Sequence, residues 1–181
     1  MGSERVLVDL DGVIRDFIGG VSIIYKKYYP EHTIKPVISR DLHLFFEIGF
    51  DIYDFIFEHY DQITNKIVPY PGAIESLNVH SEKYDIVIAT SQESWGVNVT
   101  YQWIEKYKLP VRDIIISDTK EELEGIALLD DWELNIEKFN ATGRMGVCYE
   151  QPWNSKWNNG HKVKTIDNFF ELIEKQIKQR S

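Results

Sequence analysis

Short apolar runs alternate along this chain with longer segments in which apolar residues recur every three or four positions. The longer segments predict helices, one beginning near Pro71 and others at residues 97–107, 134–139 and 167–178. The short runs predict β-strands at residues 6–8, 85–89, 114–116, 126–129 and 145–148. Because short strands that are apolar on both faces and alternate with helices are typical of parallel sheets, the pattern predicts a doubly wound α/β fold.

The segment between residues 17 and 70 departs from this alternation. It holds more than half of the Phe and Tyr residues, several of them at helical spacing between Leu42 and Tyr60. We interpret it as a small helical insertion whose aromatic side chains mostly build a core of their own. The predicted organisation is therefore a core of residues 1–16 and 71–181, with a helical cap inserted at residues 17–70.

The amino-acid composition and net charge argue against several classes of function. With 181 residues, 43% of them apolar, the chain can bury one core and support an insertion. The net charge of −9 argues against stable binding to nucleic acid, although a small phosphorylated ligand held through a metal is compatible with it. The single cysteine, Cys148, excludes an internal disulfide and a zinc framework. No apolar segment is long enough to cross a bilayer, so we expect a cytoplasmic protein without membrane contact.

Polar residues directly follow three of the predicted strands. Asp9 follows the first strand, Thr90 and Ser91 follow the second, and the pair Asp130–Asp131 follows the fourth. Each group by itself is ordinary, as a turn, a helix cap or a solvated loop. Because the carboxyl ends of parallel strands meet at one edge of a sheet, where ligands bind, the three groups together predict a single site.

The motifs and their order resemble those of a known superfamily. Asp9-Leu10-Asp11-Gly12-Val13, then Thr90, then Lys120, then Asp130-Asp131 resemble the four motifs of the haloacid dehalogenase-like phosphohydrolases, over nearly the whole chain. The segments DLDGVIRDF and YQWIEKY, with the ten-residue step from Lys120 to Asp130, are similar to the 5′(3′)-deoxyribonucleotidase family. This resemblance implies Mg²⁺-dependent hydrolysis of nucleoside monophosphates on a Rossmann-like core that carries a small helical cap.

Two carboxyl groups and a cation meet the needs of phosphate-ester hydrolysis. A phosphate monoester is negatively charged, so a carboxylate can attack it only where a cation such as Mg²⁺ neutralises the site. We expect Asp9 to be the nucleophile, forming an aspartyl-phosphate, and Asp11 to protonate the leaving alkoxide and then activate water. Gly12 would let the chain turn so that both carboxyl groups reach one phosphorus atom.

The resemblance also implies a set of metal ligands. The ion would be held by a carboxylate oxygen of Asp9, the backbone carbonyl of Asp11 and a carboxylate oxygen of Asp130, with Asp131 in a supporting position. The chain departs from the family at the next residue, where Trp132 stands in place of the usual arginine. Because this departure falls beside the expected pocket, it bears on which substrate is preferred.

The phosphate and the rest of the substrate have their own candidate residues. We expect a hydroxyl at a helix start, Thr90, and an ammonium group, Lys120, to stabilise the phosphate oxygens as they gain charge. Gly12 and Ser91 complete the expected phosphate site. By the resemblance, Phe17 occupies the position of an aromatic residue that lines the base pocket.

Two other functions stay open on the sequence alone. One is a phosphatase of the same chemistry that acts on sugar phosphates or on nucleic-acid 3′ ends, although the acidity of the chain disfavours a polymer. The other is a metal-dependent binding module without catalysis, which the presence of every expected catalytic position disfavours. The expected partner is a small phosphomonoester, and the oligomeric state is not fixed by the sequence, which is compatible with a homodimer.

Overall fold

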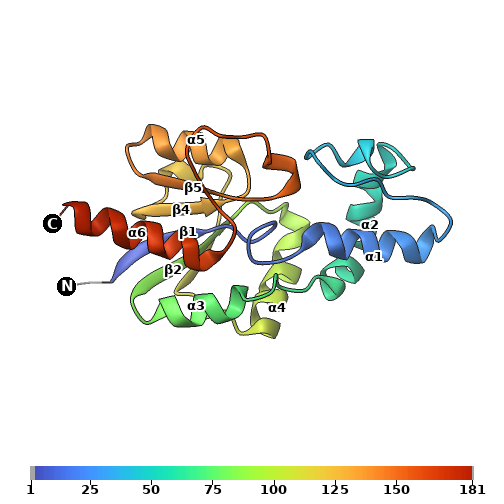
Figure 1. The fold of residues 1–181 in the computed structure, drawn as a ribbon. Coiled ribbons are helices and arrows are strands. Elements are labelled where there is room, and N and C mark those ends of the chain that lie inside the picture. The colour runs from blue at the N-terminus through green and yellow to red at the C-terminus, as the bar shows by residue number, and fades with distance from the viewer. Residues whose placement is uncertain (1–2, 181) are drawn as a thin grey trace.

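The computed structural model describes residues 3–180 and consists of a parallel sheet, flanking helices and a helical unit beside the sheet (Figure 1). The six strands have the order β3-β2-β1-β4-β5-β6, and every neighbouring pair is parallel. They are β1 (Glu4–Val8), β2 (Tyr84–Thr90), β3 (Asp113–Ile116), β4 (Ala127–Asp130), β5 (Met145–Tyr149) and β6 (His161–Val163). The predicted doubly wound α/β fold is confirmed.

Helices cover both faces of the sheet. Helix α5 (Glu133–Ala141) lies on one face, and α3 (Ala73–Ser81) and α6 (Ile166–Arg180) lie on the other (Figure 1). Helix α4 (Val97–Tyr107) follows β2 and packs toward the helical unit. Four short 3₁₀ helices complete the described elements: η1 (Leu42–Leu44), η2 (Ser94–Gly96), η3 (Lys120–Glu122) and η4 (Pro152–Asn154).

The central strands are apolar on both faces because helices cover both. In β1, Val6, Leu7 and Val8 are completely buried. Leu7 belongs to the core beneath α5, whereas Val6 and Val8 belong to the larger core that α6 covers. A strand buried in this way needs the near-continuous apolar run that the sequence carries.

All five predicted strands exist, each within two residues of its expected ends. Strand β6 was not predicted, because its three residues include His161 and Lys162 and form no apolar run. It pairs with β5 at the edge of the sheet. Only Val163 of this edge strand is buried, so the strand needs no continuous apolar run.

The helical unit comprises α1 (Phe17–Tyr28), η1 and α2 (Asp51–Lys66), and it lies beyond one end of the sheet (Figure 1). Phe46 and Phe55 pack edge-on against Tyr25, with ring centroids 4.9 and 5.7 Å away. The expected separate core is not present, because these rings belong to the same hydrophobic cluster as Val6 and Val8 of the sheet. The periodic stripe from Leu42 to Tyr60 is not one helix, because η1 ends at Leu44 and the chain turns at Gly49, where φ is +61°, before α2 begins.

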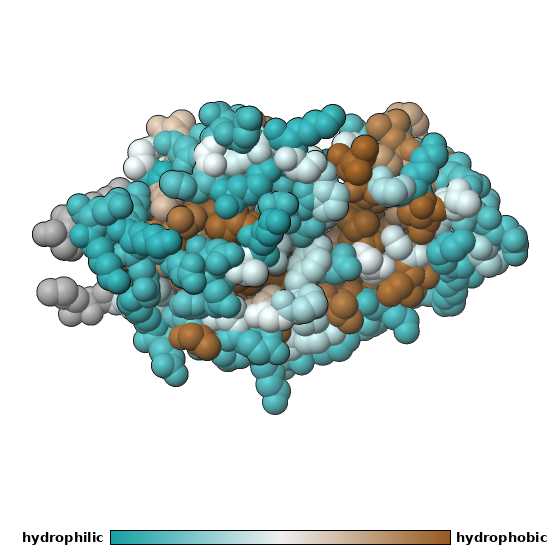
Figure 2. Space-filling model, viewed as in Figure 1, coloured by the Kyte–Doolittle hydropathy of each residue, from teal (hydrophilic) through white to brown (hydrophobic). Residues whose placement is uncertain are grey.

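The surface of the helical unit is more apolar than that of the rest of the face in view. Figure 2 shows apolar atoms gathered over the right half, where Figure 1 has α1 and α2. Phe50 and Phe57 are exposed, so packing does not account for every aromatic residue here. The division into a core of residues 1–16 and 71–181 and a cap of residues 17–70 stays a prediction.

Two chain segments connect the sheet to the helical unit, and they run side by side. The amide of Asp16 donates to the carbonyl of Val68 at 2.9 Å, and the amide of Tyr70 donates to the carbonyl of Ile14 at 2.8 Å. Between these bonds, Arg15 and Pro69 form an antiparallel bridge. In residues 3–180, no helix is both long and apolar enough to cross a membrane.

Candidate active site

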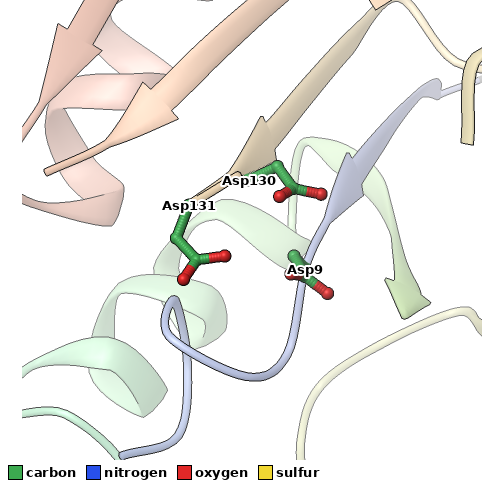
Figure 3. A group of neighbouring side chains, drawn as sticks. All are labelled: Asp9, Asp130 and Asp131. Carbon is green, nitrogen blue, oxygen red and sulfur yellow. The ribbon is translucent and has the colours of Figure 1, made fainter. Parts of the chain in front are cut away.

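Three carboxylates meet where β1 and β4 end. Val8 pairs with Leu129 in the parallel register, so Asp9 follows β1 directly beside Asp130, the last residue of β4. One carboxylate oxygen each from Asp9, Asp130 and Asp131 lies within 4.8 Å of the others, and all three residues are buried (Figure 3). The predicted convergence of these strand ends is present in the fold.

Lys120 is the buried cation of this acidic cluster. Its Nζ lies 2.9 Å from Oδ1 of Asp9 and 2.6 Å from Oδ2 of Asp130, and its side chain is almost completely buried. Burial alone would lower the pKa of the ammonium group, but Asp130 and Asp9 raise it above its ordinary value. Lys120 therefore stays charged, and it compensates one of the three negative charges.

Burial raises the pKa values of two carboxyl groups in this cluster, and the uncompensated negative charge raises them further. Burial, together with repulsion from Asp130, raises the pKa of Asp9 to about 7, although Lys120 opposes this shift. Burial and the charges of Asp130 and Asp9 raise the pKa of Asp131 to about 8. A further cation bound among these oxygens would oppose both shifts, because it favours the charged form of each carboxyl group.

The donor set fits a hard divalent cation such as Mg²⁺, which prefers carboxylate oxygens. Asp130 already accepts hydrogen bonds from Lys120, from the amide of Trp132 at 2.8 Å and from Asn135 at 2.9 Å. Asp131 accepts one bond from Nε1 of Trp153 at 2.8 Å and has a longer contact of 3.4 Å with Arg40. Asp131, expected only in a supporting position, is thus a candidate ligand as well.

Asp11 stands apart from the three clustered carboxylates. Its Oδ1 accepts a hydrogen bond from Nε of Arg15 at 2.6 Å. Its Oδ2 accepts bonds from Nη2 of Arg15 at 3.0 Å and from Nε2 of Gln92 at 2.8 Å. The carboxylate is partly exposed to the cavity, which suits a group that exchanges protons with substrate and water.

Glycine is required at position 12 for two reasons. Gly12 has a φ of +80°, a conformation that residues with a side chain rarely adopt. A Cβ atom built there would lie 2.2 Å from Oδ2 of Asp131, which is closer than atoms can approach. The turn after Asp11 and the position of Asp131 therefore both depend on the missing side chain.

Two neighbouring cavities join the acidic cluster to the helical unit. The larger, of about 270 Å³, is lined by the predicted residues Asp9, Asp11, Phe17, Thr90, Ser91, Lys120 and Asp130. The smaller, of about 130 Å³, is lined by Gly12 and Asp131 and shares Asp11, Phe17 and Arg40 with the first. Each predicted site residue thus lines one of the two cavities or both.

The two predicted hydroxyl residues differ in their surroundings. Thr90 is buried at the end of β2, and its Oγ1 accepts a hydrogen bond from Nε2 of Gln92 at 3.3 Å. Ser91 is exposed, and its hydroxyl donates to the carbonyl of Ser117 at 3.1 Å. Thr90 is therefore held in one place, whereas Ser91 must exchange its protein partner to bind a ligand.

Sequence reasoning missed several residues around these cavities. Arg15 could have been found from the sequence, because it follows Asp11 by four residues and ion pairs often have this spacing. Trp153, which no sequence pattern assigns to the site, donates to Asp131. The others carry no sequence signal of a role in the site: Arg40, Tyr60, Trp95 and Asn135.

Arg40 and Trp132 are far apart in the sequence but meet at the site. The guanidinium group of Arg40 lies over the indole ring of Trp132, 4.8 Å from its centroid, while its Nη1 reaches Asp131. Arg40 comes from the loop before η1, and Trp132 follows the acidic pair. A cation is therefore present beside Trp132, and it comes from the helical unit.

The comparisons with known proteins agree with this geometry. Residues 3–180 match the family model described as 5′ nucleotidase, deoxy (pyrimidine), cytosolic type C protein. The chain belongs to this family. It is 30% identical to the cytosolic type of 5′(3′)-deoxyribonucleotidase from Homo sapiens, over 71% of each chain. The predicted resemblance to the deoxyribonucleotidase family is confirmed.

Solved structures of other hydrolases share the fold of this chain. A predicted phosphatase from Clostridium acetobutylicum has a TM-score of 0.65 at 16% identity, covering 97% of this chain and all of that one. The HAD-hydrolase YfnB from Bacillus subtilis, solved with magnesium, has a TM-score of 0.60 at 12% identity, covering 96% of this chain and all of that one. Through its family this nucleotidase is a phosphomonoester hydrolase, as predicted.

Proposed function

We propose that this nucleotidase hydrolyses nucleoside monophosphates with the help of Mg²⁺, through an aspartyl-phosphate formed on Asp9. The observation that carries the proposal is the acidic cluster with Lys120, at the closed end of a cavity with aromatic walls. The site combines buried negative charge that needs a cation with space for a small organic phosphate. The family and the name of the human relative support the nucleotide as substrate.

The proposed metal would be held by the carboxylates of Asp9, Asp130 and Asp131, together with the backbone carbonyl of Asp11 that the resemblance implies. When bound, the ion would neutralise the phosphate and polarise its oxygens. Magnesium is proposed because the donors are all oxygen atoms and because a neighbour of the same fold was solved with it.

Asp9 and Asp11 would carry out the bond changes. A carboxylate oxygen of Asp9 attacks the phosphorus atom, the bond to the ester oxygen breaks, and that oxygen takes a proton from Asp11. Water then attacks the aspartyl-phosphate and gives a proton to Asp11, which frees phosphate and restores the Asp9 carboxylate. Each turnover consumes one water and releases an alcohol and phosphate.

The phosphate oxygens need positive charge and hydrogen-bond donors throughout this sequence. Lys120 would supply the charge, and the hydroxyls of Thr90 and Ser91 would donate hydrogen bonds. Because Lys120 is held between Asp9 and Asp130, it is already in place before the substrate arrives. Such preorganisation lowers the cost of stabilising the charge that develops during transfer.

The nucleoside would lie between the sheet edge and the helical unit. The larger cavity is walled by Phe17 and Tyr60 from the helical unit and by Trp95 and Trp132 from loops after strands. Aromatic rings of this kind bind nucleobases by stacking, with little dependence on which base is present. The human relative is named a cytosolic type, which supports a cytoplasmic location for this protein too.

The deciding experiment measures phosphate release from a panel of deoxynucleoside monophosphates, sugar phosphates and a 3′-phosphorylated oligonucleotide. We expect Mg²⁺-dependent release that is fastest with the nucleotides, and none when EDTA replaces the metal. Faster turnover of sugar phosphates or of the oligonucleotide would contradict the proposed substrate. Absence of release from every ester in the presence of Mg²⁺ would contradict the proposed catalysis.

A further inference from the structure

Arg15 is a completely buried cation at the junction of the sheet and the helical unit, outside the acidic cluster. Its side chain pairs with Asp11 through two parallel hydrogen bonds, from Nε at 2.6 Å and from Nη2 at 3.0 Å. A fork of this kind fixes the plane of a carboxylate as well as its position, since both oxygens are held at once. Asp11 is thus fixed in orientation by one residue.

The same guanidinium group contacts the helical unit and helix α4. Nη2 lies 3.3 Å from the hydroxyl of Tyr60 on α2 and 3.3 Å from Oγ1 of Thr100 on α4. The carbonyl oxygen of the Gln92 side chain accepts bonds from both hydroxyls, at 2.9 and 3.2 Å. Since Gln92 also donates to Asp11, the five side chains form one closed hydrogen-bond network.

The backbone of Arg15 lies in the connection to the helical unit. Arg15 bridges to Pro69, and its carbonyl accepts a hydrogen bond from the amide of Gly12 at 3.0 Å. A shift of the helical unit relative to the sheet would act on this connection and on the bond to Tyr60 together. The orientation of Asp11 is therefore tied to the position of the helical unit.

Charge compensation alone does not explain this arrangement. Asp11 is partly exposed, so water could solvate its carboxylate without a buried partner. Nη1 of Arg15 is buried and, within the described part of the chain, has no hydrogen-bond partner, which is an unfavourable state for a guanidinium nitrogen. A buried arginine with an unpaired nitrogen is an expensive partner for a carboxylate that water could solvate. Such a partner is expected where the orientation of the carboxylate matters for function.

We propose that Arg15 is a positioning residue for the hydrolysis, which keeps the carboxyl group of Asp11 aimed at the leaving oxygen of the substrate. The proposal rests on the proposed function, in which Asp11 gives a proton to the leaving alkoxide. An alkoxide leaving group needs that proton, whereas a nitrophenolate leaves readily without it. Loss of Arg15 should therefore matter for nucleotides and matter little for p-nitrophenyl phosphate.

The test compares kcat/KM of the wild type, Arg15→Met and Arg15→Lys on a deoxynucleoside 5′-monophosphate and on p-nitrophenyl phosphate, both with Mg²⁺. The ratio kcat/KM reports the steps up to departure of the leaving group, so later hydrolysis of the phosphoenzyme does not enter. We expect Arg15→Met to lower it about 10²-fold for the nucleotide, the scale of a misplaced catalytic group, and less than about 3-fold for the aryl ester. Arg15→Lys keeps the positive charge but cannot form the two simultaneous hydrogen bonds to Asp11. It should therefore show the same selective loss to a smaller extent.

A double-mutant cycle separates positioning from a merely structural role. If Arg15 acts through Asp11, then Arg15→Met should lower nucleotide turnover no further in an Asp11→Asn background. Arg5→Met is the matched control, because Arg5 lies at the surface with only a 4.0 Å contact to Glu124. The thermal midpoint of each variant shows whether folding has changed.

The outcomes distinguish this proposal from the function on which it rests. Equal losses on both esters, or additive losses in the double mutant, would overturn the positioning role while leaving the nucleotidase activity in place. If Arg15→Met does not fold, an unselective loss in a folded Arg15→Lys would overturn it in the same way. Failure of the wild type to hydrolyse either ester with Mg²⁺ would overturn the proposed function and this role with it.

Discussion

The two sides of the larger cavity are built differently. On the sheet side, Asp9, Lys120 and Asp130 are buried, and both carboxylates form ion pairs with Lys120. On the side of the helical unit, Phe17 is only half-buried and Arg40 is exposed. The sheet side is therefore suited to holding reacting atoms in place, and the helical side to touching whatever part of the substrate lies beyond the phosphate.

The reason for this difference lies in how each side is attached. Parallel register fixes the ends of β1 and β4 relative to each other, so the carboxylates have little freedom. The helical unit is joined to the sheet through two short segments, near Arg15 and Pro69. Changes in the acidic cluster should affect all phosphate esters alike, whereas changes on the helical side should affect some substrates more than others.

The largest expected effect is that of Asp9→Asn on the sheet side. The amide is nearly the same size as the carboxylate but is a far poorer nucleophile, so turnover should fall by about 10⁴-fold or more on every ester. Phosphate release with Mg²⁺ measures this, and circular dichroism checks that the fold is retained. Near-normal release by a folded variant would show that Asp9 is not the nucleophile.

Asp11→Asn should have a smaller and more selective effect. General acid–base catalysis contributes about 10² to 10⁴ in rate, and the proton matters most for a poor leaving group. We expect kcat/KM to fall by this amount on a nucleotide and much less on p-nitrophenyl phosphate. Wild-type kcat/KM on the nucleotide would rule out the assigned acid role.

Phe17→Ala tests the helical side. If the ring stacks on a nucleobase, kcat/KM for nucleotides should fall by the equivalent of about 1 to 3 kcal/mol, with little change for a small aryl phosphate. Phe50→Ala is the matched control, because Phe50 belongs to the same unit and is 71% exposed. Equal losses on both substrates together with a lowered thermal midpoint would instead indicate that Phe17 is a packing residue.

The last prediction concerns stability without metal rather than a rate. The pKa values of Asp9 and Asp131 are raised in the folded protein to about 7 and about 8, from the ordinary value of 3.8. A raised carboxyl pKa contributes stability below the unfolded value that is lost as pH rises through the folded value. In EDTA, the thermal midpoint should therefore decrease as the pH is raised from 4 to 8. Addition of Mg²⁺ at pH 8 should raise the midpoint again.

Asp131→Asn is the control. It separates the effect of the raised pKa of Asp131 from the repulsion among the many other negative charges of the protein. Because the amide carries no charge, the variant should be more stable than the wild type at pH 8 in EDTA and equally stable at pH 4. Each kcal/mol corresponds to about 2 to 4 °C in Tm for a protein of this size. Identical pH profiles for the two proteins would contradict the raised pKa of Asp131.

The convergence of Asp9, Thr90 and Asp130 at one edge could be predicted because each residue ends an apolar run. Strand ends are local features, and parallel pairing carries them to the same edge whatever the details of packing. Lys120 was predicted only by its spacing to Asp130 within the resemblance, and its two ion pairs came from the fold. Their chemical roles rest on the proposed reaction and stay predictions.

The sequence by itself determined the doubly wound sheet, the helical character of residues 17–70 and the edge at which the acidic residues gather, because these follow from periodicity and strand order. Only the tertiary structure decided that Asp131 joins the acidic cluster, that Trp153 bonds to it, and that Arg40 stacks on Trp132. These contacts join segments from 22 to 122 residues apart, where no local pattern exists. They depend on how the helical unit and the loops pack against the sheet, and side-chain packing is a property of the whole fold.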